Sequence, residues 1–130
     1  MRYFLLLLVL YPSHLFGKLR NQEFIVEKEN LEIIKKHIKT FSPWEPNEVM
    51  INRLQQALDD KTTIHGADAC FYFHELKEAE LMGTGYTYSE AHAQAINDYD
   101  VSPFSLYHPD VIVAYPDDFN SSWKKHWGIQ

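Results

Sequence analysis

The stretch Ala67–Tyr99, ADACFYFHELKEAELMGTGYTYSEAHAQAINDY, decides the fold of this chain. Its first half carries apolar residues at helical spacing, and Gly83 is a natural stop for such a helix. Thr87 and Glu90 then match the Thr-x-x-Glu pattern of a capping box, which predicts that a second helix begins there and runs to the end of the stretch. Because the connection at 83–85 is short, we expect the two helices to form an antiparallel hairpin.

The flanking sequence predicts further helices around this hairpin. Helical periodicity covers 31–41, with Asn30 as the expected N-cap, and 48–59, with Asn47 as the expected N-cap. The last third is rich in proline and aromatic residues, and His108-Pro109-Asp110 resembles the entry of one more helix. The fold class expected is therefore mainly α: a small single domain with a central antiparallel helical hairpin and an aromatic-rich irregular C-terminal third.

The N-terminal residues have the composition of an export segment. Residues 1–17 combine an early arginine, a short apolar run and a proline break, and the run is too short to span a bilayer. We expect 1–17 to be a signal peptide or N-terminal anchor, 18–29 a linker or extended arm, and 30–130 a single helical domain. This organisation predicts a secreted or periplasmic bacterial protein with no stable membrane span after signal removal.

Composition restricts the class of protein further. The chain has 130 residues, 15% of them aromatic, and a formal net charge of -6. Without residues 1–17, which contain one arginine and no acidic residue, 11 basic residues face 18 acidic ones, or -7. This balance argues against tight, non-specific binding of nucleic acid. Cys70 is the only cysteine, so no intrachain disulfide is possible.

Polar residues with catalytic or metal-binding potential concentrate on the predicted hairpin. His74 and Glu78 are four residues apart and share one face of its first helix, with Glu75 on the flank. His92 lies on the second helix, and closure of the hairpin would bring it near His74 and Glu78.

Three interpretations of these residues stay open. In the first, His74, Glu78 and His92 hold a metal ion, for which zinc is the candidate cofactor, and Glu75 acts as general base on the bound water. In the second, the same residues perform metal-free acid–base catalysis, as in many ribonucleases. In the third, they only satisfy one another as buried polar pairs.

Other polar residues are assigned by position. His65 and Asp68, at the start of the first hairpin helix, are candidate substrate-binding residues that would join the same end of the site. His37 and His126 are expected at the surface.

The runs HELKEAELMGTGYTYSEAHAQA (74–95), SPFSLYHPDVI (102–112) and YPDDFN (115–120) resemble the C-terminal toxin domains of bacterial polymorphic toxins of the Rhs and contact-dependent inhibition types. The resemblance extends over roughly 52–120. It implies an effector that acts on a competitor cell, in most such cases a hydrolase and often a nuclease, with an immunity protein as partner and nucleic acid as substrate. The residues that it highlights are His74, Glu75, Glu78 and His92 as catalytic residues, and Tyr107, His108 and Asp110 as substrate-binding residues.

Two alternatives from other classes remain. One is a zinc-dependent hydrolase of another substrate. The other is a non-catalytic exported binding protein, in which the aromatic C-terminal third forms the contact surface and the hairpin is a scaffold.

Overall fold

The computed structural model describes Leu19, residues 22–99 and residues 102–130. The expected signal or anchor segment, 1–17, therefore lies outside the described residues, as does part of the expected linker at 18–29.

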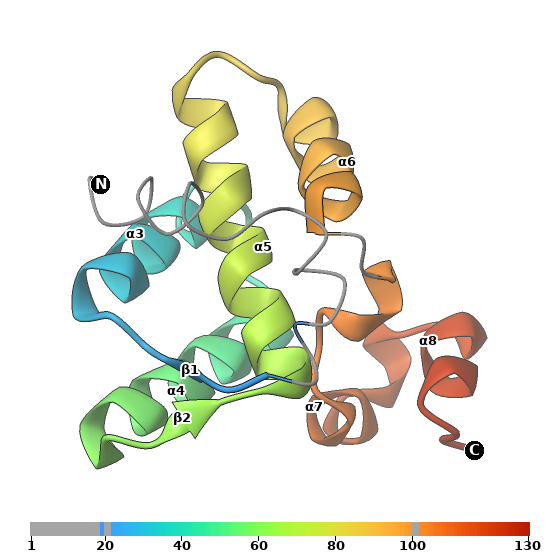
Figure 1. Ribbon diagram of the computed structural model, residues 1–130. Coiled ribbons are helices and arrows are strands. Elements are labelled where there is room, and N and C mark those ends of the chain that lie inside the picture. Colours follow the sequence, from blue (N-terminus) through green and yellow to red (C-terminus); the bar gives the residue numbers. More distant parts are fainter. Residues whose placement is uncertain (1–18, 20–21, 100–101) are drawn as a thin grey trace.

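One long helix, α5 (Gly66–Gly83), runs through the middle of the molecule (Figure 1). Helices α3 (Lys28–Ile38), α4 (Glu45–Asp60) and α6 (Tyr88–Tyr99) each pack against it. Eleven residues of α5 are buried, so this helix has no continuous polar face. The mainly helical class expected from the sequence is confirmed.

A two-stranded antiparallel sheet is the only sheet within the described residues. Strand β1 (Phe24–Ile25) pairs with β2 (Thr63–Ile64), and Phe24 is opposite Ile64. The sheet therefore joins the segment before α3 to the connection between α4 and α5. Leu19 and Val26 are buried in the common core, so the arm is packed against the helical domain at these two residues.

The hairpin of α5 and α6 forms as the sequence predicts. The Thr87 amide donates to Glu90 Oε1 at 2.9 Å, and the Glu90 amide donates to Thr87 Oγ1 at 3.2 Å, which completes the capping box at the start of α6. Gly85 has φ +107°, a backbone conformation that residues with a Cβ rarely adopt. The chain thus reverses direction at the top of Figure 1, and α6 returns along α5.

Helix α3 begins earlier than expected, and Asn30 is not its N-cap. The Tyr72 hydroxyl, on α5, accepts 3.0 Å hydrogen bonds from the Glu27 amide and from Asn30 Nδ2. Asn30 is consequently a buried residue within the first turn of α3. The start of this helix is set by a tertiary contact, which a local capping pattern does not reveal.

Helix α4 also begins before its expected cap. Pro46 occupies the first turn, where a missing amide donor costs nothing. Asn47 lies inside the helix, and its side-chain oxygen accepts a hydrogen bond from the Tyr107 hydroxyl.

The C-terminal third consists of short helical pieces, in the order η2 (Pro103–Ser105), α7 (Pro109–Ala114), η3 (Pro116–Asp118) and α8 (Ser121–His126). His108 caps α7 through Nδ1, which accepts from the Asp110 amide at 3.0 Å. Helix α7 packs on α4, and η2 packs on both α5 and α8. Among the described residues, no helix is both long enough and apolar enough to span a bilayer.

Candidate functional site

Three potential metal-ligand atoms from the hairpin lie at equal distances from one another. His74 Nε2 is 3.1 Å from Glu78 Oε2, His92 Nδ1 is 3.1 Å from the same oxygen, and the two ring nitrogens are 3.1 Å apart. An ion about 2.05 Å from each atom, an ordinary zinc distance, would sit ~1 Å above the plane of this triangle. The distance between His74 and His92 that the hairpin prediction requires is therefore present.

Helix geometry positions these side chains. His74 and Glu78 are one turn apart on α5, so their side chains project on the same face. His92 lies in the second turn of α6, which the capping box starts at a fixed place opposite that face. The rings of His74 and His92 meet edge to face, with centroids 4.8 Å apart.

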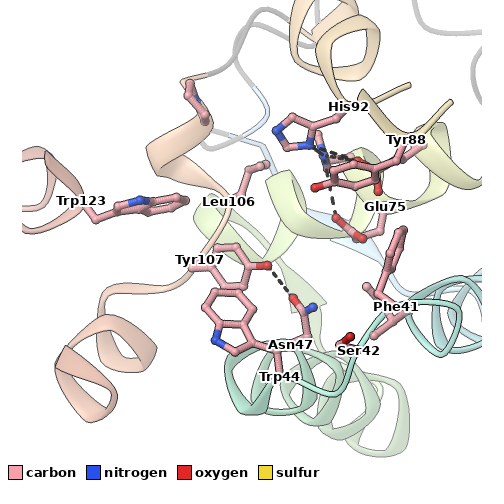
Figure 2. Close-up of a pocket in the computed structure, with 14 residues that line it drawn as sticks. Phe41, Ser42, Trp44, Asn47, Glu75, Tyr88, His92, Leu106, Tyr107 and Trp123 are labelled. Carbon is pink, nitrogen blue, oxygen red and sulfur yellow. Dashed lines mark hydrogen bonds and ion pairs between the residues drawn. The ribbon is translucent and has the colours of Figure 1, made fainter. Parts of the chain in front are cut away.

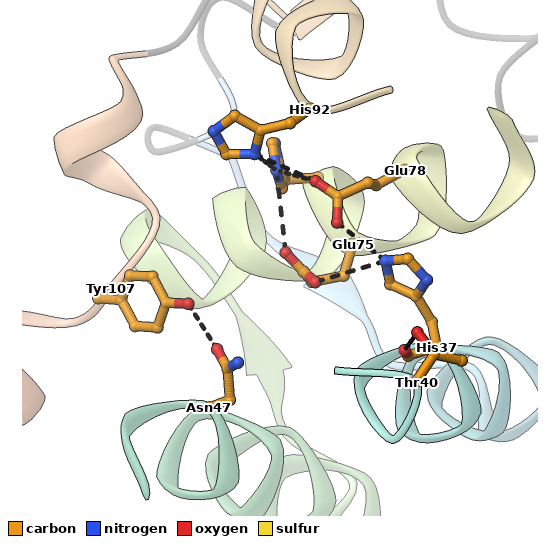
Figure 3. Close-up of polar contacts among 8 residues, drawn as sticks. His37, Thr40, Asn47, Glu75, Glu78, His92 and Tyr107 are labelled. Atoms are coloured by element: carbon orange, nitrogen blue, oxygen red, sulfur yellow. Dashed lines mark hydrogen bonds and ion pairs between the residues drawn. The ribbon is translucent and has the colours of Figure 1, made fainter. Parts of the chain in front are cut away.

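The second oxygen of Glu78 contacts a residue that we expected at the surface. His37, on α3, is buried, with 7% of its area exposed, and its Nε2 is 2.9 Å from Glu78 Oε1 (Figure 3). The surface expectation is wrong because His37 follows Ile34 by three residues and precedes Ile38, so it belongs to the buried face of α3. The neighbouring lysines lie on the other side of the helix or at its edge.

Glu75 lies between the two sets of histidines. Its Oε1 is 3.9 Å from His37 Nε2, and its Oε2 is 3.9 Å from His74 Nε2. Both distances are too long for a hydrogen bond. Glu75 is nevertheless 93% buried (7% exposed) and forms part of a pocket wall.

The pKa values of the two carboxyl groups are shifted in opposite directions. Burial raises the pKa of Glu78, but the hydrogen bonds from His37, His74 and His92 outweigh it and hold this pKa far below its usual range. Burial, followed by the negative charge of Glu78, raises the pKa of Glu75 well above its usual range. Burial also lowers the pKa of His74, against the opposing effect of Glu78. Glu75 thus holds its proton more strongly than an ordinary carboxyl group, whereas Glu78 beside it favours the ionised form and His74 the neutral form.

A pocket of about 480 Å³ opens beside these residues (Figure 2). Its wall includes His74, Glu75, Glu78 and His92, and no described lining residue is a lysine or arginine. The rest of the wall is largely aromatic and apolar. It comes from α3, α4 and their connection, α6 and the C-terminal third: Ile38, Phe41, Ser42, Trp44, Asn47, Tyr88, Pro103, Leu106, Tyr107 and Trp123. Tyr107, an expected substrate-binding residue, is thus in the pocket.

The remaining expected substrate-binding residues form a separate group. Asp68 accepts two hydrogen bonds from Arg53, at 2.8 and 2.9 Å, and His65 shares a shallow surface pocket with both. His108 lies close enough for its pKa to respond to this group: burial lowers it, as does the charge of Arg53. Asp110 is exposed and contacts His108. Because His65 precedes His74 by nine residues, the two lie about 13 Å apart along α5.

The cluster therefore offers two sets of ligands that share one carboxylate. His74, Glu78 and His92 form one set, and His37, Glu75 and Glu78 form the other; within each set the ligand atoms lie within 4.8 Å of one another. His74 Nδ1 is buried and has no hydrogen-bond partner among the described residues. Such a set of imidazoles and carboxylates suits zinc and other divalent first-row metals.

Comparison of the chain with protein-family models, with curated proteins and with solved structures gives no significant match in any of the three searches.

The polar contributors His37 and Asn47 were not identified from the sequence. His37 could have been assigned to the buried face of its helix from its spacing to Ile34 and Ile38. Asn47 carried no such signal, because its partner Tyr107 is 60 residues away.

Proposed function

We propose that this protein is a metal-dependent hydrolase, with one divalent ion, zinc in the simplest case, held by His74, Glu78 and His92. The observation that carries the proposal is the 3.1 Å triangle of ligand atoms. Two imidazole N–H donors would have to approach Glu78 Oε2 only about 60° apart, closer together than the lone-pair directions of a carboxylate oxygen. A single cation satisfies all three atoms at once.

The arrangement is open on the side that a substrate needs. Three protein ligands leave a fourth position for water, as in catalytic zinc sites. Such an ion would supply a water of lowered pKa at that position. Glu75, whose Oε2 lies 3.9 Å from His74 Nε2, is the carboxylate placed to accept a proton from that water and to return it to the leaving group when the bond to the leaving group breaks.

Nuclease activity and a toxin role are narrower proposals, supported by the sequence pattern. Trp44 and Tyr88 in the pocket wall are aromatic side chains of the kind on which bases stack. The wall has no basic side chain among its described residues, so contact with nucleic acid would be confined to the reacting nucleotide and the metal. This differs from a protein that binds along the nucleic-acid backbone.

Metal content is the first test. The full chain, with any affinity tag removed, is analysed for bound metal and then for hydrolysis of single-stranded oligonucleotides, esters and peptides. We expect metal in the parent and at least a 10-fold loss of affinity, together with loss of hydrolysis, in His74→Gln, His92→Ala and Glu78→Gln. His126→Ala, which changes an exposed histidine outside the pocket, is the control and should match the parent.

The results separate the alternatives. A protein that binds no metal but loses hydrolysis in the same variants would be a metal-free acid–base catalyst. A protein that binds metal and hydrolyses nothing in the panel would be a metal-binding protein without this activity. The toxin role is tested separately, by inducing the parent and His92→Ala in bacterial cells; equal growth inhibition by the two would contradict it.

A further inference from the structure

We infer that the cluster holds two divalent ions rather than one, bridged by Glu78, and that the pair of ions binds the phosphate group of a substrate. The inference rests on the proposed function for its first ion. The second ion would use His37, Glu75 and Glu78.

The carboxylate of Glu78 is oriented as a bridge between the two sets of histidines. Glu78 has Oε1 at 2.9 Å from His37 and Oε2 at 3.1 Å from His74 and His92. Glu75 lies beside it, with Oε1 3.9 Å from His37 Nε2 and Oε2 3.9 Å from His74 Nε2, so Oε1 is the atom placed to bind the second ion. In Figure 3 the two carboxylates lie between His37 on one side and His92 on the other.

A second ion also accounts for the position of the Glu75 carboxylate beside His37. The side chain is 93% buried (7% exposed), and its closest ring nitrogens are beyond hydrogen-bond distance. A separation of 3.9 Å is too long for a hydrogen bond but suits two widely separated ligands of one ion, each about 2.1 Å from it. Two ions that share a carboxylate would lie about 3.5–4 Å apart, as in two-metal hydrolytic sites.

Charge identifies the class of ligand. With one divalent ion, two ionised carboxylates neutralise the site, and the pocket wall contributes no lysine or arginine among its described residues. With two divalent ions the same carboxylates leave a net charge of about +2, and both ions present open positions. Only the two-ion state therefore attracts a phosphate group, because the metals supply the positive charge that the wall lacks.

The test is metal stoichiometry on the full chain. Metal-free protein is titrated with Mn²⁺, and bound ions are counted by equilibrium dialysis and observed by electron paramagnetic resonance. We expect two equivalents, and magnetic coupling between the ions as the second one binds. Glu75→Gln and His37→Gln, both similar in size to the parent residue, should bind one ion at the first site and lose affinity for the second at least 100-fold. His126→Ala should bind two.

Phosphate binding provides the second readout. Inorganic phosphate should bind the protein loaded with two equivalents of Mn²⁺ at least 10-fold more tightly than the one-equivalent form or His37→Gln. One equivalent in the parent overturns the second ion and leaves the proposed function intact, with His37 as a hydrogen-bond donor to Glu78. No bound metal overturns both. Two equivalents that persist in His37→Gln and Glu75→Gln contradict the assigned ligands, and phosphate affinity independent of metal loading contradicts the ligand class.

Discussion

His37 and Glu78 are 41 residues apart in the chain, yet the His37 ring nitrogen lies 2.9 Å from the Glu78 carboxylate and both side chains are almost completely buried. The contact joins α3 to α5 at the centre of the candidate site. It makes Glu78 a residue on which three elements converge, since His92 reaches the same carboxylate from α6.

The first prediction concerns the acid stability of the metal-free protein. The pKa of Glu78 is held below its ordinary value of 4.5 by three imidazoles, so its ionised form stabilises the fold above pH 4.5. This stabilisation is lost as the pH falls below 4.5 towards the folded-state pKa. We expect Glu78→Gln to be less stable than the parent by about 2–4 kcal/mol at pH 7, with the difference shrinking in acid. Urea denaturation of both chelator-treated proteins between pH 7 and pH 3 measures this difference in the free energy of unfolding. A difference that does not change with pH would contradict a lowered pKa of Glu78.

The turn between α5 and α6 gives a second prediction, with its own internal control. Gly85→Ala places a Cβ at φ +107° and should lower the free energy of unfolding by about 1–2 kcal/mol. Gly83→Ala, two residues earlier, meets no atom within 4 Å and lies in a helix, so it should be neutral or stabilising by up to about 1 kcal/mol. Thermal unfolding of the two variants is compared; equal losses would mean that the turn conformation is not the cause.

A third prediction concerns the ion pair between Arg53 and Asp68, at the start of α5. Arg53→Lys removes the two-point contact with Asp68, a partly exposed ion pair, and should cost about 0.5–1 kcal/mol. It should leave metal affinity and hydrolysis unchanged, because Arg53 and Asp68 do not line the pocket that contains His74 and Glu78. If a folded Arg53→Lys protein loses hydrolysis with normal metal content, the group belongs to substrate binding after all, as the sequence pattern implied for Asp68.

Tyr107 gives the fourth prediction, at alkaline pH. Burial raises the pKa of its hydroxyl well above the ordinary value of 10, so the neutral form stabilises the fold below pH 10 and this contribution is lost as the pH rises beyond it. Tyr107→Phe should cost about 1 kcal/mol at pH 8, because the hydrogen bond to Asn47 is lost. Above pH 10 the difference should shrink and then change sign. Denaturant titrations of the parent and Tyr107→Phe at pH 8 and pH 11 measure the difference in the free energy of unfolding. The prediction fails if the parent is as much more stable than the variant at pH 11 as at pH 8.

The hairpin and the meeting of His74 with His92 could be predicted because they depend on short-range signals. A glycine-containing turn and a capping box fix where α6 begins, and the helical repeat then decides which residues face α5. The ends of α3 and α4 could not be predicted in the same way. Asn30 and Asn47 have the right residue type for caps, but their side chains form hydrogen bonds with Tyr72 and Tyr107 instead. Both partners are more than 40 residues away in the chain.

The composition of the site was less predictable than its location. His37 stands next to Lys36 and two residues before Lys39, and this local charge concealed its place on the buried face of α3. The group around Asp68 was expected at the site because Asp68 and His74 are both on α5, but six residues separate them, or about 9 Å along the helix axis. Proximity in sequence along a helix thus proved a poor guide to proximity in the pocket.

The Tyr72 hydroxyl has a consequence for the order of assembly. Since it accepts from the Glu27 amide and from Asn30, α5 completes the first turn of the helix that carries His37. The His74, Glu78 and His92 triangle needs only a loop of 18 residues to close, whereas His37 needs α3 to dock over more than 40. Loop-closure entropy favours the shorter contact, so the three-ligand half of the site can form in a folding chain before the His37 half exists.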